Sequence, residues 1–91
     1  MTPATDSQFD VFPTSLSLLR VEPPRNILRY YRITVQRDLF GGASLVREWG
    51  RVGYPGKVMV QCFSDEGRAI SELLRLAAVK RRRGYRLDHP G

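Results

Sequence analysis

The sequence is poor in residues that build covalent or metal-based sites. It has one cysteine, Cys62, and one histidine, His89, among 91 residues. A single cysteine excludes a disulfide within the chain and a cysteine-based zinc cluster, and the apolar run around Cys62 predicts a buried, reduced thiol. No stretch approaches the roughly 18 apolar residues of a membrane-spanning helix, and the start of the chain lacks the pattern of a signal peptide. We therefore expect a soluble, cytoplasmic protein that binds no metal ion, no cofactor and no membrane.

Groups that support catalysis are also scarce. A nucleophile needs a neighbouring base and an orienting group, and the only histidine lies in residues 89–91, which we predict to be a disordered tail. The sequence contains no phosphate-cradling glycine loop. The acids Glu48, Asp65, Glu66 and Glu72 are expected to form ion pairs or to cap a helix. These observations predict a protein that is not an enzyme and has no small-molecule substrate.

Lysine is rare although the chain is strongly basic. Of its 15 basic residues, all but Lys57 and Lys80 are arginines, and the net charge is +6. The charge is uneven, because residues 1–24 carry a net charge of −2 and residues 25–91 a net charge of +8. Guanidinium groups suit bidentate phosphate contacts, although a GC-rich genome would also enrich arginine. A sequence pI of about 10.2 indicates a polyanionic partner.

Runs in which apolar and polar residues alternate, separated by prolines and glycines, predict a sheet. A flexible arm is expected over residues 1–14 and a folded domain over residues 15–88. Strands are predicted at 15–22, 28–37, 44–52 and 57–63, with a short edge strand at 85–87. The second strand should place Tyr31, Ile33 and Val35 on one face and Tyr30, Arg32, Thr34 and Gln36 on the other. Pro23 and Pro24 should end the first strand, and glycines should make the later turns.

One helix follows the strands. Ser64 is placed to cap its first amides, and Gly84 is placed to end it in a left-handed conformation. Apolar residues at helical spacing predict a buried stripe made of Ile70, Leu73, Leu74 and Ala77. The sequence therefore predicts an α+β fold in which a small antiparallel sheet of four to five strands packs against one α-helix.

The most informative segment is Trp49-Gly50-Arg51, which ends the third predicted strand. Alternation places Arg47, Trp49 and Arg51 on one face, so that two guanidinium groups flank the only tryptophan. Such a face can stack on a base or sugar and neutralise phosphate, and Gly50 would allow a flat approach from the opposite face. The alternative is a core tryptophan whose arginines extend away from it to solvent.

These residues carry a resemblance to a known family. Asn26, Tyr30-Tyr31-Arg32-Ile33, Arg47-Glu48-Trp49-Gly50-Arg51-Val52-Gly53, Lys57 and the late run Lys80-Arg81-Arg82-Arg83-Gly84-Tyr85 together resemble a WGR domain over about residues 15–88. WGR domains occur in DNA-damage-sensing poly(ADP-ribose) polymerases and in bacterial proteins. The resemblance implies a sheet with a packed helix, no catalytic activity, and recognition of a DNA strand end by the tryptophan and arginine of the motif, as in DNA repair.

The expected nucleic-acid-binding residues form four groups. Trp49, Gly50, Arg51 and Arg47 come first, and Lys57 and Tyr54 are expected at the rim. Tyr30 and Arg32 would join them if the strand register brings them to the same face. The run Lys80, Arg81, Arg82 and Arg83 is either a phosphate-facing patch or a set of solvated charges that complement the helix dipole.

Two functions remain open on this basis. The first is a DNA-binding module that prefers ends or breaks. The second is a protein-interaction adaptor that docks on a separately encoded DNA-processing or regulatory enzyme, because tryptophan and arginine are also enriched at protein-binding hot spots. RNA is compatible with the charge, although no feature favours it.

Overall fold

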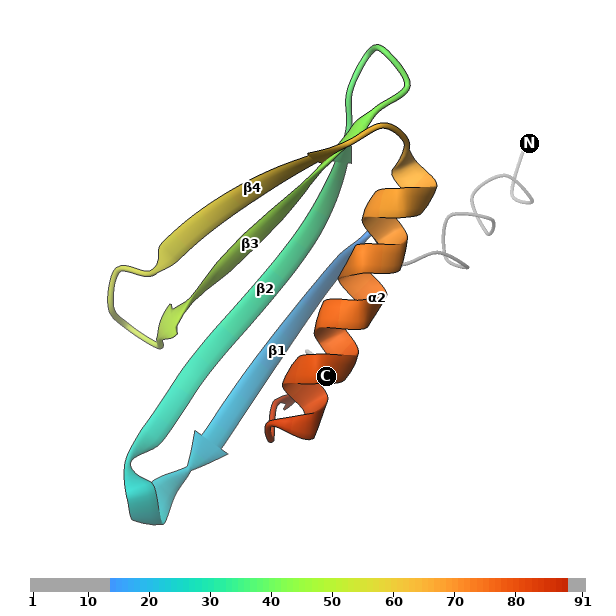
Figure 1. Ribbon diagram of the computed structural model, residues 1–91. Helices are drawn as coiled ribbons and strands as arrows, with labels where there is room; N and C mark the ends of the chain where they lie inside the picture. Colours follow the sequence, from blue (N-terminus) through green and yellow to red (C-terminus); the bar gives the residue numbers. More distant parts are fainter. Residues whose placement is uncertain (1–13, 89–91) are drawn as a thin grey trace, which may run out of the picture.

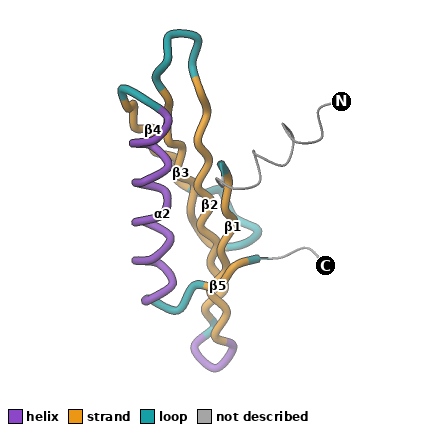
Figure 2. The backbone as a smooth tube through the Cα atoms, turned by 90° about the vertical axis from the view of Figure 1, so that its right-hand side faces the viewer, coloured by secondary structure: helices purple, strands orange, loops and turns teal. Residues whose placement is uncertain are grey.

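The computed structural model describes residues 14–88, in which five antiparallel strands form one sheet and a helix lies on one of its faces (Figures 1 and 2). The elements are β1 (Ser15–Glu22), η1 (Pro23–Arg25), β2 (Ile27–Arg37), β3 (Ala43–Arg51), β4 (Lys57–Phe63), α2 (Glu66–Arg82) and β5 (Arg86–Leu87). The order across the sheet is β4-β3-β2-β1-β5. The predicted α+β fold is confirmed, whereas the predicted arm, except for Thr14, and the predicted tail lie outside the described residues.

The connection between β1 and β2 follows from its prolines. Pro23 and Pro24 open the single turn η1, because their fixed φ fits the start of a helix. Asn26 then takes a left-handed conformation with φ 55° and donates its backbone N–H to the Pro23 carbonyl at 2.9 Å. Asparagine tolerates this region better than most residues. The chain therefore reverses here, and the turn extends beyond the C-terminal end of α2 (Figures 1 and 2).

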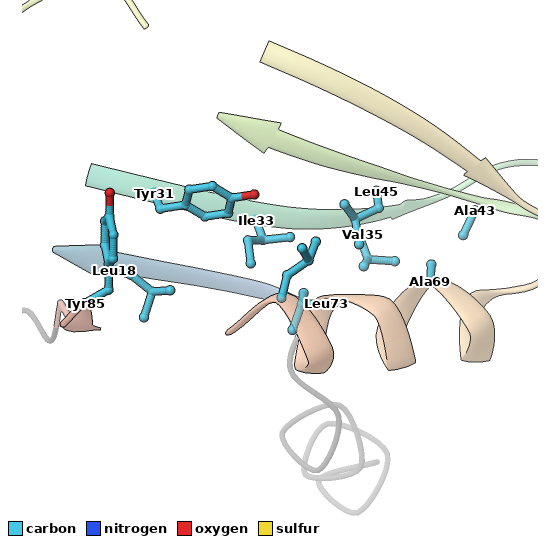
Figure 3. Packing of buried hydrophobic residues seen from close by; sticks show 10 residues of the cluster. Leu18, Tyr31, Ile33, Val35, Ala43, Leu45, Ala69, Leu73 and Tyr85 are labelled. Carbon is cyan, nitrogen blue, oxygen red and sulfur yellow. The ribbon is translucent and has the colours of Figure 1, made fainter. Parts of the chain in front are cut away.

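The core lies between α2 and the helix-facing side of the sheet, as Figure 3 shows. Leu18, Ile33, Leu45 and Leu73 are its largest fully buried side chains. The buried residues of the helix are Ala69, Leu73, Leu76 and Ala77. Leu74, which the predicted stripe included, is 50% exposed, so that part of the prediction is wrong. The helix is rotated so that Leu76 takes the buried position and Leu74 faces solvent.

Both ends of α2 have local causes. Asp65, and not Ser64 as predicted, is the N-cap, because its carboxylate accepts the Arg68 backbone N–H at 2.8 Å. Gly84 follows the helix with φ +99°, which confirms the predicted left-handed ending. No helix within the described residues 14–88 is long and apolar enough to cross a membrane.

The face of the sheet opposite α2 carries several exposed apolar side chains. On β4, Val58 pairs with Glu48, Val60 with Val46 and Cys62 with Ser44, and these pairs point away from the helix. Cys62 is exposed, so the prediction of a buried thiol is wrong. Alternation correctly placed Val58, Val60 and Cys62 on one face, but that face is not the one that α2 covers.

Candidate functional site

Trp49 lies near the end of β3, on the face of the sheet that carries the helix. The strand register pairs it with Tyr31 on β2 and with Lys57 on β4. Its ring stacks on that of Tyr31, with centroids 5.9 Å apart and planes inclined by 22°. Trp49 is partly buried against the core and partly open to solvent. It therefore combines a packing role with partial exposure to solvent.

The register corrects one expectation about β2. Because Trp49 pairs with Tyr31, the neighbouring residues Tyr30 and Arg32 lie on the opposite face of the sheet. There Arg32 forms an ion pair with Glu48 at 2.7 Å and lies over the Tyr30 ring at 5.7 Å. The expectation that they share the face of Trp49 is wrong, because a shift of one residue moves every side chain to the other face.

Gly50 has a structural role that explains why a side chain is absent there. A Cβ at Gly50 would lie 3.0 Å from the Gly56 Cα and 3.6 Å from the Tyr30 hydroxyl oxygen. The turn after β3 thus folds back onto the strand, and Tyr30 closes over it. The expected flat approach of a ligand to this face of Gly50 is wrong, because Gly56 and Tyr30 already occupy that space.

Three arginines stand side by side next to Trp49 and Tyr31, where the sheet extends past the end of α2. Arg51 on β3 pairs with Arg29 on β2, and Arg29 pairs with Arg20 on β1. Their parity places all three on the helix-facing side of the sheet. We call these three residues the cationic row. Directly opposed residues on neighbouring strands have Cβ atoms about 4.5–5.5 Å apart, so like charges repel one another here.

Two members of the cationic row have partners within the protein. Arg20 donates to Glu22 at 2.6 Å, and this hydrogen bond is the main cause that lowers the pKa of Glu22. Arg51 donates to the backbone oxygen of Asn26 at 3.1 Å and to its Oδ1 at 3.3 Å. Within residues 14–88, Arg29 forms no side-chain hydrogen bond or ion pair, and it is exposed. The middle of the row is therefore the place where an external anion would be held most strongly.

A pocket of about 270 Å³ joins the tryptophan to this row. It is lined by Arg29, Trp49, Gly50, Arg51 and Tyr85. The wall thus combines an aromatic edge with two guanidinium groups, which are the side chains that stack on a base or sugar and bind phosphate.

Arg47, the other arginine flanking Trp49, is not among the residues that line this pocket. It donates to the thioether sulfur of Met59, and its Nε is buried with no hydrogen-bond partner among the described residues. Its charge helps to lower the pKa of Glu72, for which the hydrogen bond from Arg75 is the main cause. Arg47 therefore serves the contact between the sheet and α2.

The basic residues at the C-terminal end of α2 differ in their contact with the aromatic side chains of the site. The Lys80 ammonium group lies 4.5 Å from the centroid of the Tyr31 ring and 5.6 Å from that of Tyr85. Burial, followed by the charges of Arg83 and Arg47, lowers the pKa of Lys80. Lys80 is thus a partly buried cation behind the aromatic side chains, where a cation–π contact stabilises it.

The other arginines of the run are more open. Arg81 and Arg82 line a separate pocket of about 540 Å³ together with Gly84, Tyr85, Arg86 and Leu87. Arg83 is the exposed C-cap. The run thus complements the helix dipole, and it also lies next to the aromatic pocket through Tyr85.

The two residues expected at the rim, Lys57 and Tyr54, are exposed and lie close to Trp49 and Arg51. Lys57 pairs directly with Trp49, and Tyr54 lies in the following turn with the Arg51 guanidinium 5.8 Å from its ring centroid. Sequence reasoning missed Arg20, Arg29, Tyr31 and Tyr85 as parts of the site. The alternation of β2 already placed Arg29 with Tyr31, but only the register between strands shows that both lie beside Trp49.

The fold and this surface together define a small α+β domain with a basic and aromatic face. The chain belongs to the WGR domain family, which it matches over residues 14–91. WGR is a non-catalytic domain family. Membership of this family is consistent with a role as a nucleic-acid-binding module.

A curated relative and the solved structures complete the comparison. The chain is 43% identical over 74 residues to "Uncharacterized protein y4dW" from Sinorhizobium fredii (strain NBRC 101917 / NGR234). This similarity covers 81% of the chain but 36% of the relative, so the chain spans about a third of that protein's length. No solved structure is significantly similar to the chain.

Proposed function

We propose that this WGR domain binds DNA, with a preference for strand ends or breaks, through the pocket between Trp49 and the cationic row. Lys57 and Tyr54 extend the surface on one side, and Lys80 to Arg83 extend it on the other. Arg47, Tyr30 and Arg32 act in support of the sheet and not as DNA contacts.

The cationic row is the observation that carries this proposal. Three arginines opposed across three strands oppose folding by mutual repulsion, and in the described part of the chain internal partners offset this only for Arg20 and Arg51. A phosphate bound at Arg29 would relieve the repulsion and form charge-assisted hydrogen bonds. Long-range attraction comes from the +8 net charge of residues 25–91.

The preference for ends rests on Trp49. Trp49 is partly exposed, and stacking of an exposed base or sugar on its ring would be worth about 1–3 kcal/mol. A continuous duplex keeps its bases stacked on one another and offers no free aromatic face, whereas an end or a nick does. Phosphate contacts should therefore contribute to the affinity for every form of DNA. Trp49 should account for the higher affinity for DNA that has an end or a nick.

The phosphate contact is tested by replacing Arg29 with glutamine. Since Arg29 has no internal partner in the described residues and repels Arg20 and Arg51, its replacement should not weaken folding, while one phosphate contact is lost. The slope of log affinity against log salt should then fall by about 0.9. Arg68→Gln is the matched control, because Arg68 lies at the far end of α2 and, among residues 14–88, pairs only with Asp65, at 3.4 Å. Equal slopes for the two variants, measured by fluorescence anisotropy, would refute the role of Arg29.

The preference for ends is tested with Trp49→Phe, which retains an aromatic ring on Tyr31 and so limits the loss of stability. Gel shifts should compare nicked, gapped, blunt-ended and covalently closed circular DNA at physiological salt, with single-stranded RNA as a further probe. The variant should lose affinity for nicked and blunt DNA and change little on closed circles. An equal loss on all DNA forms contradicts recognition of ends.

A protein adaptor is the second candidate function, and the tip of the β2–β3 hairpin favours it. Leu39 and Phe40 are 96% and 93% exposed there. The Asp38 carboxylate holds the tip in shape by accepting the backbone N–H groups of Phe40 at 2.7 Å and Gly42 at 2.9 Å. Two large apolar side chains on a structured tip are typical of a protein anchor. A pure adaptor would show only weak DNA binding that ignores ends in the same gel shifts.

A further inference from the structure

The outer edge of β4 is unpaired. β4 is the last strand on one side of the sheet, and β3 is its only strand partner within the described residues. The opposite edge is partly covered, because β5 pairs with β1 at Leu18 and Leu19. The seven residues of β4 therefore present a row of free backbone donors and acceptors, which is a template for another strand.

This edge lacks the features that normally prevent strand pairing. Its sequence, Lys-Val-Met-Val-Gln-Cys-Phe, contains no proline, and its pairing with β3 advances one residue at a time without a bulge. Lys57 is the only charged residue and lies at one end. Val58 and Val60 are 62% and 56% exposed and point to the face without the helix. A largely apolar edge of this kind, charged only at one end, is a favourable site for pairing with another strand.

We infer that β4 pairs with β4 of a second copy of this chain and forms a symmetric dimer. When a strand pairs antiparallel with its own copy, the two-fold axis passes through a pair of identical residues. An axis at Val60 pairs all seven residues, and each shift of the axis by one residue loses two pairs. This register sets Val58 against Cys62 of the second copy and Met59 against its Gln61.

Charge distribution favours a second copy as the occupant. With the axis at Val60, the two Lys57 residues lie at opposite ends of the joint, separated by about 20 Å along the strands at roughly 3.3 Å per residue. That distance exceeds the Debye length of about 8 Å at physiological ionic strength. The centre of the edge is neutral, so it attracts neither an acidic nor a basic peptide. The result is a continuous sheet of ten strands with both helices on the same face.

The inference does not require DNA binding, because Lys57 is the only β4 residue in the proposed DNA surface and β4 is separated from Arg29 on β2 by β3. The salt dependence of dimerisation should also be much weaker than that of DNA binding. Burial of apolar and backbone groups is weakened little by salt, whereas DNA binding falls steeply as salt rises. Failure of one proposal can therefore be recognised without reference to the other.

Light scattering of the full chain after size exclusion tests the inference. The mass should rise from 10.4 kDa towards twice that value as concentration increases. Val60→Lys should keep the mass at 10.4 kDa at every concentration. Leu74→Lys, which places the same charge at a site of similar exposure on the outer side of α2, should dimerise as the parent does. A parent that stays monomeric, or a Val60→Lys variant that dimerises equally, would overturn the inference.

Hydrogen exchange identifies the interface directly. Alternate amides of β4 point outward and should exchange rapidly in dilute protein and slowly in concentrated protein, while those of Val60→Lys should remain rapid. Thermal unfolding of Val60→Lys at low concentration should match the parent, which shows that the variant folds. Dimerisation without a change in β4 exchange would place the interface elsewhere and overturn the proposal, even if a peptide from another protein bound this edge.

Discussion

Gly56 lies against the backbone of Trp49, and replacing it with alanine should destabilise the protein. A Cβ at this position would collide with the Tyr30 hydroxyl oxygen and would lie 2.6 Å from the Trp49 carbonyl oxygen. The tyrosine side chain can rotate away, but the carbonyl oxygen can move only if β3 shifts. Overpacking of this kind costs about 1–3 kcal/mol.

The cost can be measured by urea unfolding with Trp49 fluorescence as the signal. For a domain of this size, each kcal/mol lowers the melting temperature by about 4–8 °C. Gly67→Ala is a control with the opposite sign. Gly67 is within α2, where alanine is favoured over glycine by roughly 0.5–1 kcal/mol, and its Cβ would meet only the flexible Asp65 carboxylate, at 3.3 Å.

A second substitution separates the two collisions at Gly56. Tyr30→Phe removes the hydroxyl and leaves the Trp49 carbonyl in place. Gly56→Ala should therefore remain destabilising in the Tyr30→Phe background, although by less than in the parent. If the cost disappears in that background, the contact with the Trp49 backbone is not what requires glycine. A change of less than about 0.5 kcal/mol in the parent itself would refute the steric reasoning altogether.

Two further predictions concern α2. Leu73→Ala should lower the free energy of unfolding by about 2–5 kcal/mol in chemical denaturation, because Leu73 is fully buried, whereas Leu74→Ala should have little effect. Glu72→Gln should remove up to about 0.5 kcal/mol at neutral pH, because Arg75 hydrogen-bonds the Glu72 carboxylate and lowers its pKa. A lowered carboxyl pKa stabilises the fold above the unfolded value of 4.5. The difference between parent and Glu72→Gln should therefore vanish as pH falls below that value, and a difference that persists in acid would contradict it.

The strand positions could be predicted closely because prolines and glycines at the strand ends determine where the chain turns. Pro23 and Pro24 end β1, and the glycines after β2 and β3 force reversals, so β1 and β4 have the predicted bounds. The helix was predicted by its apolar spacing, but its rotation was not. The predicted stripe and the observed one both contain Leu73 and Ala77. They differ in that the predicted stripe adds Ile70 and Leu74, whereas the observed one adds Ala69 and Leu76. Alanine is too weakly apolar for the sequence to favour the observed stripe.

The functional surface was harder to predict because it depends on relations between strands. Alternation showed which residues of each strand share a face, and this holds for Trp49 with Arg51 and for Tyr31 with Arg29. Which tyrosine adjoins Trp49 depends on a register that the sequence of either strand alone does not set. Cys62 illustrates the same limit, because β4 has apolar residues on both faces and only the docking of α2 decides which face is covered.

The separation of Trp49 from the hairpin tip has a mechanical consequence. The 11 residues of β2 span about 35 Å at roughly 3.3 Å per residue, and they carry Arg29 near one end while Leu39 and Phe40 follow the other. Two partners held at these places would not touch each other. The domain would then act as a rigid spacer. The two partners could bind in either order, and the binding of one would not change the affinity for the other.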